Sequence, residues 1–222
     1  IPPTLGTMLV CGAIHHAAQN NPVMNHNVLV YGKLQRVKGP DIAARALVRV
    51  MRDLADEWSG SVFFAGDDMS CDVDPTMSMS ACIRSSEIPS DLQVRFRFVG
   101  RVGRGKLGKF ATNQRIRLAV LPSRYETFCL AAHEAAYFGI PVVLPRLPAY
   151  EGYFVDRVNS FTFVSSSVDD LTRVLRSAIT DDGMIDRVAN VAHSISYPDP
   201  AWGYRILFNR DARVTHSFHT AR

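Results

Sequence analysis

Residues 124–143 read RYETFCLAAHEAAYFGIPVV and lie between two apolar runs, 116–121 and 141–144. The two runs have the length of buried strands, and the stretch between them indicates a tight turn followed by a helix. The order strand, turn, helix, strand is that of a parallel α/β unit. This stretch therefore predicts the fold class and the place of a ligand site.

The start of the expected helix is suited to an anion. A helix N-terminus carries unpaired N–H groups and the positive end of the helix dipole, and both favour a phosphate. The amides expected to point at the anion are those of Thr127, Phe128, Cys129 and Leu130.

Two glutamates bracket seven residues in this stretch. Glu126 lies at the mouth of the helix and Glu134 about two turns further on, roughly 12 Å away at the helical rise. That separation is about the reach from a sugar, past a diphosphate, to a ribose, and carboxylates accept hydrogen bonds from sugar hydroxyls. The alternative is an ordinary helix with two surface glutamates.

The E-x7-E pattern, followed by A-x-x-x-G-x-P-V-V, resembles the signature of the retaining glycosyltransferases of the GT-B fold, in particular family 4. The resemblance implies that Glu126 contacts the hydroxyls of the donor sugar and Glu134 the ribose. Cys129 stands where the family most often has Gly. Cysteine is small, so its amide could still approach a phosphate, though less closely.

A basic loop, GKLQRVKG at residues 32–39, follows the first apolar run. It contains neither the GxGxxG fingerprint nor a P-loop. It resembles the family's G-R-x-x-x-x-K-G loop, which implies that Gly32, Lys33 and Lys38 surround the donor diphosphate. Lys38 matches the family directly, whereas Lys33 replaces an arginine and offers a point charge instead of a two-pronged fork. Arg36 could substitute for it, and a solvated basic loop is the alternative.

Two further positions follow strands. Arg101 and Val102 come after the third expected strand, where the family's loop holds the nucleobase, largely through backbone groups. Ser123 ends the fourth strand, and its hydroxyl either reaches a phosphate or caps the turn. Asn159 matches the family's E-x-V-x-D-G-x-N-G-x-L stretch, whereas Arg157 and Ser160 replace its glycines.

Strands and helices alternate along the chain, which predicts a Rossmann-like parallel sheet flanked by helices, one half of a GT-B fold. The expected strands are 27–31, 61–66, 94–100, 116–121, 141–144 and 161–164. Besides the helix of the signature, the expected helices are 40–54, 77–85, 105–113, 168–179 and 201–208. Residues 1–26 are expected to be a linker or the end of a missing N-terminal domain, residues 27–196 the nucleotide-sugar-binding domain, and residues 197–222 a C-terminal helix and tail. Trp202 and Tyr204 resemble the family's final helix.

The composition is that of a globular protein, with 47% hydrophobic and 21% charged residues, and no apolar run approaches the ~20 residues of a membrane span. The net charge of +4 suits phosphate ligands or an anionic membrane face, and no nucleic-acid-binding motif is present. The four cysteines follow no zinc or redox spacing, which favours free thiols in the cytoplasm. We expect no metal: the pair Asp67-Asp68 and the pair Asp72 and Asp74 lie in a polar loop far from the signature, and His15-His16 has no third ligand nearby.

The function implied is that of the donor-binding half of a retaining glycosyltransferase. It would move a sugar from a nucleotide-sugar to a glycan, lipid or polysaccharide precursor, with the acceptor bound by the missing N-terminal domain at the inner face of the membrane. No cofactor is implied, because the basic side chains and the helix N-terminus would stabilise the leaving diphosphate. The fragment alone is expected to be inactive or nearly so. The alternatives are a non-catalytic sugar-nucleotide-binding or scaffold domain, and a GT-B-fold epimerase or phosphorylase.

Overall fold

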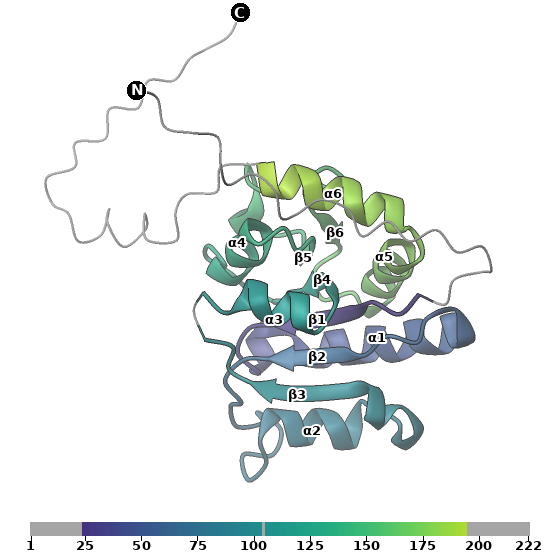
Figure 1. Ribbon diagram of the computed structural model, residues 1–222. Coiled ribbons are helices and arrows are strands. Elements are labelled where there is room, and N and C mark those ends of the chain that lie inside the picture. Colours follow the sequence, from purple (N-terminus) through teal and green to yellow (C-terminus); the bar gives the residue numbers. More distant parts are fainter. Residues whose placement is uncertain (1–23, 104, 195–222) are drawn as a thin grey trace, which may run out of the picture.

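A computed structural model describes residues 24–103 and 105–194 (Figure 1). It contains a single parallel sheet of six strands in the order β3-β2-β1-β4-β5-β6. The strands are β1 (Asn27–Tyr31), β2 (Val62–Ala65), β3 (Phe96–Gly100), β4 (Ile116–Val120), β5 (Val142–Pro145) and β6 (Phe161–Phe163). The predicted Rossmann-like α/β fold is therefore confirmed.

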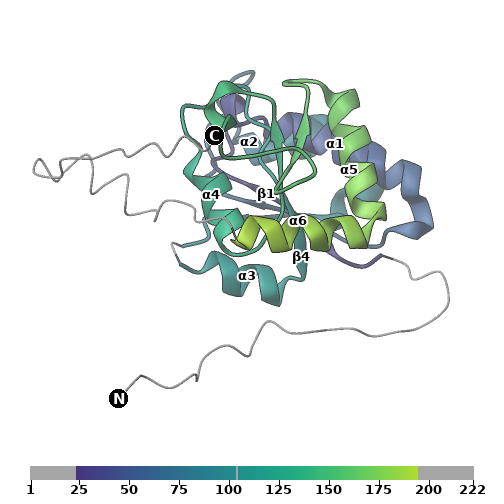
Figure 2. The same cartoon turned by 90° about the horizontal axis from the view of Figure 1, so that it is seen from above.

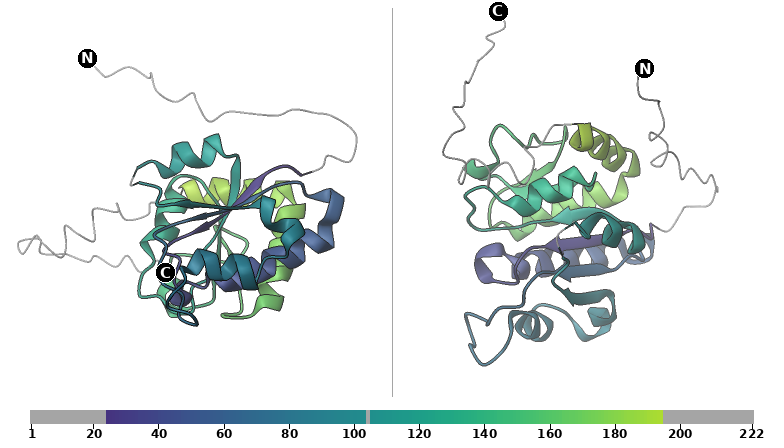
Figure 3. Two further views of the ribbon diagram at one scale, coloured as in Figure 1. Left: turned by 90° about the horizontal axis from the view of Figure 1, so that it is seen from below. Right: turned by 60° about the vertical axis from the view of Figure 1, so that its left-hand side comes forward.

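Six α-helices flank the sheet within the described residues. They are α1 (Pro40–Leu54), α2 (Met79–Ser86), α3 (Leu107–Asn113), α4 (Leu130–Tyr137), α5 (Val168–Thr180) and α6 (Asp182–Ser194). Figure 2 shows α1 and α5 on the side of the central strands opposite to α3 and α4, and Figure 3 shows the strands between these groups. The helix α6 packs against both α4 and α5.

The buried residues form two clusters, one on each face of the sheet. Alternate residues of one strand belong to different clusters: Val28 and Val30 pack with α1 and α5, whereas Leu29 packs with α3 and α4. Because neighbouring strand residues point to opposite faces, a strand buried on both faces has a continuous apolar sequence. This explains why strands β1, β2, β4 and β5 can be recognised from short apolar runs.

Local sequence sets the start of two long helices. Pro40 occupies the first turn of α1, where its missing N–H costs nothing. The Ser167 hydroxyl caps α5 by accepting a hydrogen bond from the Asp170 amide.

Several predicted boundaries were wrong. The helix α2 begins at Met79, two residues later than predicted, because the Ser78 side chain caps it by accepting from the Ala81 amide. Residues Ser90–Arg95 form a 3-10 turn, so β3 begins only at Phe96. The helix α6 was not predicted at all. The predicted helix at 201–208, Trp202, Tyr204 and His15-His16 lie outside the described residues.

Among the helices of residues 24–103 and 105–194, none combines the length and the apolar sequence that a membrane span requires.

Candidate nucleotide-sugar site

A pocket of about 710 Å³ opens at the carboxyl ends of the strands. Its volume lies within the range of small-molecule sites. It lies where the strand order reverses between β1 and β4, the place at which open α/β sheets bind ligands. The residues that line it are Tyr31, Gly32, Lys33, Ala65, Gly66, Asp67, Arg101, Val102, Gly105, Leu130, Ala131, Glu134, Tyr137 and Phe138.

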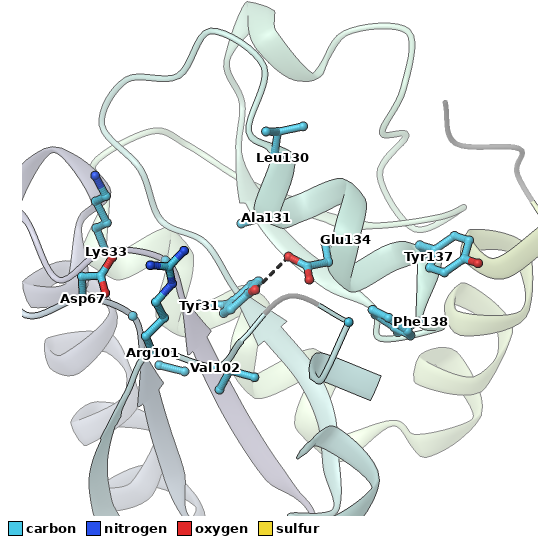
Figure 4. Close-up of a pocket in the computed structure, with 14 residues that line it drawn as sticks. Tyr31, Lys33, Asp67, Arg101, Val102, Leu130, Ala131, Glu134, Tyr137 and Phe138 are labelled. Atoms are coloured by element: carbon cyan, nitrogen blue, oxygen red, sulfur yellow. Dashed lines mark hydrogen bonds between the residues drawn. The ribbon is translucent and has the colours of Figure 1, made fainter. Parts of the chain in front are cut away.

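One hydrogen bond crosses this pocket. The Tyr31 hydroxyl, at the end of β1, donates to Glu134 Oε2 on α4 at 2.8 Å (Figure 4). Burial first, and then this bond, raises the pKa of Tyr31 above its ordinary value, so the hydroxyl stays a proton donor. Sequence reasoning found Glu134 but missed Tyr31, whose place inside an apolar strand gave no sign of a polar role.

Among the described residues, two cationic side chains, Lys33 and Arg101, line the pocket. Figure 4 shows Lys33, Asp67 and Arg101 grouped on one side of the pocket and Glu134 on the other, with Tyr31 between them. Glycines 32 and 66 allow the ends of β1 and β2 to meet here, since a Cβ on Gly66 would lie 1.8 Å from the Gly32 carbonyl oxygen. The pocket thus presents two cationic groups and one carboxylate at one end and a second carboxylate at the other, which suits a ligand with a phosphate and a hydroxyl-rich part.

A second group of predicted residues lies outside the pocket lining. Lys38 Nζ donates to Glu126 Oε1 at 2.6 Å, and the Ser123 hydroxyl donates to the same oxygen at 2.8 Å. The Glu126 side chain is only 6% exposed, whereas that of Lys38 is 33% exposed. The predicted basic loop and the predicted signature are therefore in direct contact, although they lie 88 residues apart.

A tight approach of two backbone segments positions this group. Gly39 has φ +68°, and a Cβ there would lie 2.1 Å from the Pro122 carbonyl oxygen. Arg124 donates its amide to the Val37 carbonyl and forms two bonds to the Asp41 carboxylate, at 2.9 and 2.7 Å. Burial alone would raise the pKa of Asp41, but the bonds from Arg124 hold that pKa below its ordinary value. Sequence reasoning missed this pair.

The structure corrects the expected helix start. The helix α4 begins at Leu130, and Cys129 precedes it with φ 55° and ψ 70°, in the left-handed region. The amides of Thr127, Phe128 and Cys129 therefore belong to the preceding turn, and only that of Leu130 lies in the first helical turn. Glycine adopts this region freely, which gives a physical reason for the family's preference for Gly at this position.

The Cys129 side chain points into the protein and not into the pocket. Burial first, and then the charge of Glu126, raises the pKa of the Cys129 thiol to about 11, and the thiol lies beside the Tyr150 hydroxyl. The thiol is thus neutral, and it does not line the pocket where a ligand would lie. Cys129, where the family most often has Gly, therefore strains the backbone but does not fill the pocket.

An aromatic cluster holds the turn before α4. Phe128 stacks on the buried His133 ring with a centroid distance of 4.5 Å, and Tyr153 and Phe154 pack against the same imidazole. Burial lowers the pKa of His133 to about 4, so the ring is neutral at pH 7. Asn159 closes the adjoining loop by donating to the Tyr153 carbonyl and accepting from the Val155 amide.

The acidic loop residues have local partners. Asp68 accepts from the amide and hydroxyl of Ser80, and Asp74 accepts from those of Thr76. Within residues 24–103 and 105–194, no group of three or more His, Cys, Asp or Glu side chains could hold a metal ion.

The family model for glycosyl transferases group 1 matches residues 13–194. The chain belongs to this family. No curated protein matches it. The match and the sheet together make the described part of this family member one Rossmann-like domain of a GT-B fold.

Solved structures of glycosyltransferases share the fold. WaaG, a glycosyltransferase involved in lipopolysaccharide biosynthesis, matches with a TM-score of 0.66 and 19% identity over 85% of this chain and 48% of its own. The C-terminal domain of a glycosyl transferase group 1 family protein (LpcC) from Francisella tularensis matches with a TM-score of 0.61 and 17% identity, over 76% of this chain and 82% of its own. Anabaena Alr3699/HepE in complex with UDP matches with a TM-score of 0.63 and 19% identity, over 77% of this chain and 43% of its own. The chain thus spans less than half of WaaG and of the Anabaena protein.

Proposed function

We propose that this chain is the donor-binding half of a retaining glycosyltransferase that uses a nucleoside-diphosphate sugar. The observation that carries the proposal is the pocket at the strand reversal, which is lined by Glu134 and by Lys33 and Arg101. The chain's membership of the glycosyl transferase family supports the same ligand class. The nucleoside would lie over Glu134 and Val102, and the diphosphate would extend towards Lys33 and the Leu130 amide. The Anabaena neighbour, which is described in complexes with UDP and UDP-glucose, supports this ligand class.

The group formed by Lys38, Ser123 and Glu126 is assigned to the reacting end of the donor. Lys38 would offset the negative charge that develops on the leaving diphosphate, a form of electrostatic stabilisation. Glu126 already accepts two hydrogen bonds on Oε1, and these reduce its nucleophilicity. That favours a role in orienting a sugar hydroxyl over covalent attack on the sugar.

The acceptor is assigned to a part of the full protein outside this chain, and a glycan, lipid or polysaccharide precursor is the class we propose. The net charge of +4 suits work beside an anionic membrane surface in the cytoplasm. No metal or cofactor enters the proposed mechanism.

Calorimetric titration with UDP, GDP and ADP tests the proposal. Lys38→Ala should weaken binding of the preferred diphosphate by roughly 10- to 100-fold, the value of a charge-assisted hydrogen bond. Glu134→Gln should also weaken it, because the ligand still contains ribose, whereas Glu126→Gln should leave it nearly unchanged.

Lys109→Ala and Glu57→Gln, on exposed residues outside the pocket, are the matched controls. A wild-type chain that binds none of the three diphosphates would favour the scaffold alternative. A loss of affinity in Glu126→Gln but not in Glu134→Gln would reverse the two assigned roles.

A further inference from the structure

Tyr31 is held on a rigid part of the pocket. It is the last residue of β1, a central strand, and pairs in register with Ala65 of β2. Its ring packs against the buried cluster beneath α3 and α4. A side chain on a central strand is placed more accurately than one on a loop, so its hydroxyl is a fixed point on the pocket wall.

The Tyr31 hydroxyl fixes the position of the Glu134 carboxylate. Its Oε2 accepts from Tyr31, whereas Oε1 accepts no hydrogen bond from the described part of the chain. A free glutamate side chain has three rotatable bonds, and ordering it on binding lowers affinity. The bond to Tyr31 sets the carboxylate in one orientation before a ligand arrives, with one oxygen left for a ligand hydroxyl.

We propose that Tyr31 is a positioning residue that makes Glu134 a selective acceptor for the ribose hydroxyls, so that the site prefers ribonucleotides to deoxyribonucleotides. This inference rests on the proposed function, because it needs a nucleoside diphosphate in the pocket. Selectivity follows from the fixed geometry. A deoxyribose leaves Glu134 Oε1 facing a missing donor, and an acceptor that the ligand covers without pairing is costly.

The test is the affinity ratio between a ribonucleotide and its deoxy analogues. UDP, 2′-deoxy-UDP and 3′-deoxy-UDP are titrated into the 222-residue chain by calorimetry, with GDP or ADP and their analogues in place of UDP if either binds more tightly. The wild type should prefer the ribonucleotide to at least one analogue by roughly tenfold or more, the range of a hydrogen bond to a charged group. Tyr31→Phe should weaken ribonucleotide binding several-fold and reduce that preference to about threefold or less.

The control is Tyr125→Phe, which removes the same hydroxyl from an exposed tyrosine outside the pocket and should retain the wild-type preference. A circular-dichroism melt of each variant separates a loss of fold from a loss of selectivity. An unchanged or increased ribose preference in a folded Tyr31→Phe variant would overturn the role of Tyr31 alone. A wild type that binds no nucleoside diphosphate would overturn the proposed function, and this inference with it.

Discussion

Replacement of Glu126 by Gln removes the charge that faces Lys38 but leaves an oxygen to accept from Ser123. In the wild type, Lys38 Nζ and Glu126 Oε1 are 2.6 Å apart, with the carboxylate buried and the ammonium one-third exposed. A hydrogen bond to a charged group contributes about 1.5–3 kcal/mol. Because solvent reaches Lys38 and screens the pair, we expect the lower end of that range, about 1.5–2 kcal/mol. For a domain of this size the melting temperature should fall by about 3–8 °C.

The assay is a double-mutant cycle read by urea unfolding. The four proteins are the wild type, Lys38→Met, Glu126→Gln and the double variant, and their unfolding free energies give the coupling between the two side chains. The matched control is the ion pair Arg49–Asp169, which joins α1 to α5 with side chains 52% and 89% exposed. An exposed pair of this kind should couple by less than about 0.5 kcal/mol.

The reasoning is refuted if the Lys38–Glu126 coupling is as small as that of the exposed control. Salt provides an independent check, because 0.5 M NaCl should weaken the exposed pair more than the partly buried one. A coupling that disappears in salt would mean that the carboxylate is hydrated in solution.

Three further outcomes are expected. The free energy of unfolding should fall by roughly 3 kcal/mol as the pH drops from about 6.5 to 4. The reason is that the pKa of His133 is about 4 in the folded protein and 6.5 in the unfolded chain, so the unfolded chain takes up the proton first. In urea melts, His133→Leu should make the free energy of unfolding depend less on pH in this range. Arg124→Lys keeps the charge but loses the two-bond fork to Asp41, so it should cost about 1 kcal/mol of stability and weaken diphosphate binding in calorimetry, whereas equal binding would separate this pair from the site. Addition of EDTA should leave sugar transfer by the full-length enzyme largely intact, and an absolute need for magnesium or manganese would contradict the proposed mechanism.

Most of the sheet was predictable because β1, β2, β4 and β5 are buried on both faces. Runs such as 28–31 and 141–144 have no polar interruption that would suggest a helix, and the turns between the strands are marked by Gly or Pro. The helix α6 escaped prediction because Gly183 and two aspartates at its start look like a loop. Its apolar contacts at Ile185, Val188 and Ala192 become evident only when α4 and α5 are in place.

The candidate site was predictable as a set of residues but not as a geometry. Motif spacing identified Lys38, Glu126 and Glu134, but no spacing reports that Lys38 pairs with Glu126 or that Tyr31 reaches Glu134. These contacts join segments about a hundred residues apart, so they depend on the order of strands in the sheet. The left-handed Cys129 was equally hidden, since cysteine carries no signal for that conformation.

The bond between Tyr31 and Glu134 spans 103 positions of the chain, and the bond between Lys38 and Glu126 spans 88. Each joins the segment around β1 to the segment after β4, so a molecule seated between them touches both halves of the sheet at once. Local opening of either half of the sheet would then require release of the bound molecule, so the ligand would stabilise both halves by mass action. Amide hydrogens of β1 and α4 should therefore slow their exchange together when a nucleotide binds, as though the two segments belonged to one cooperative unit.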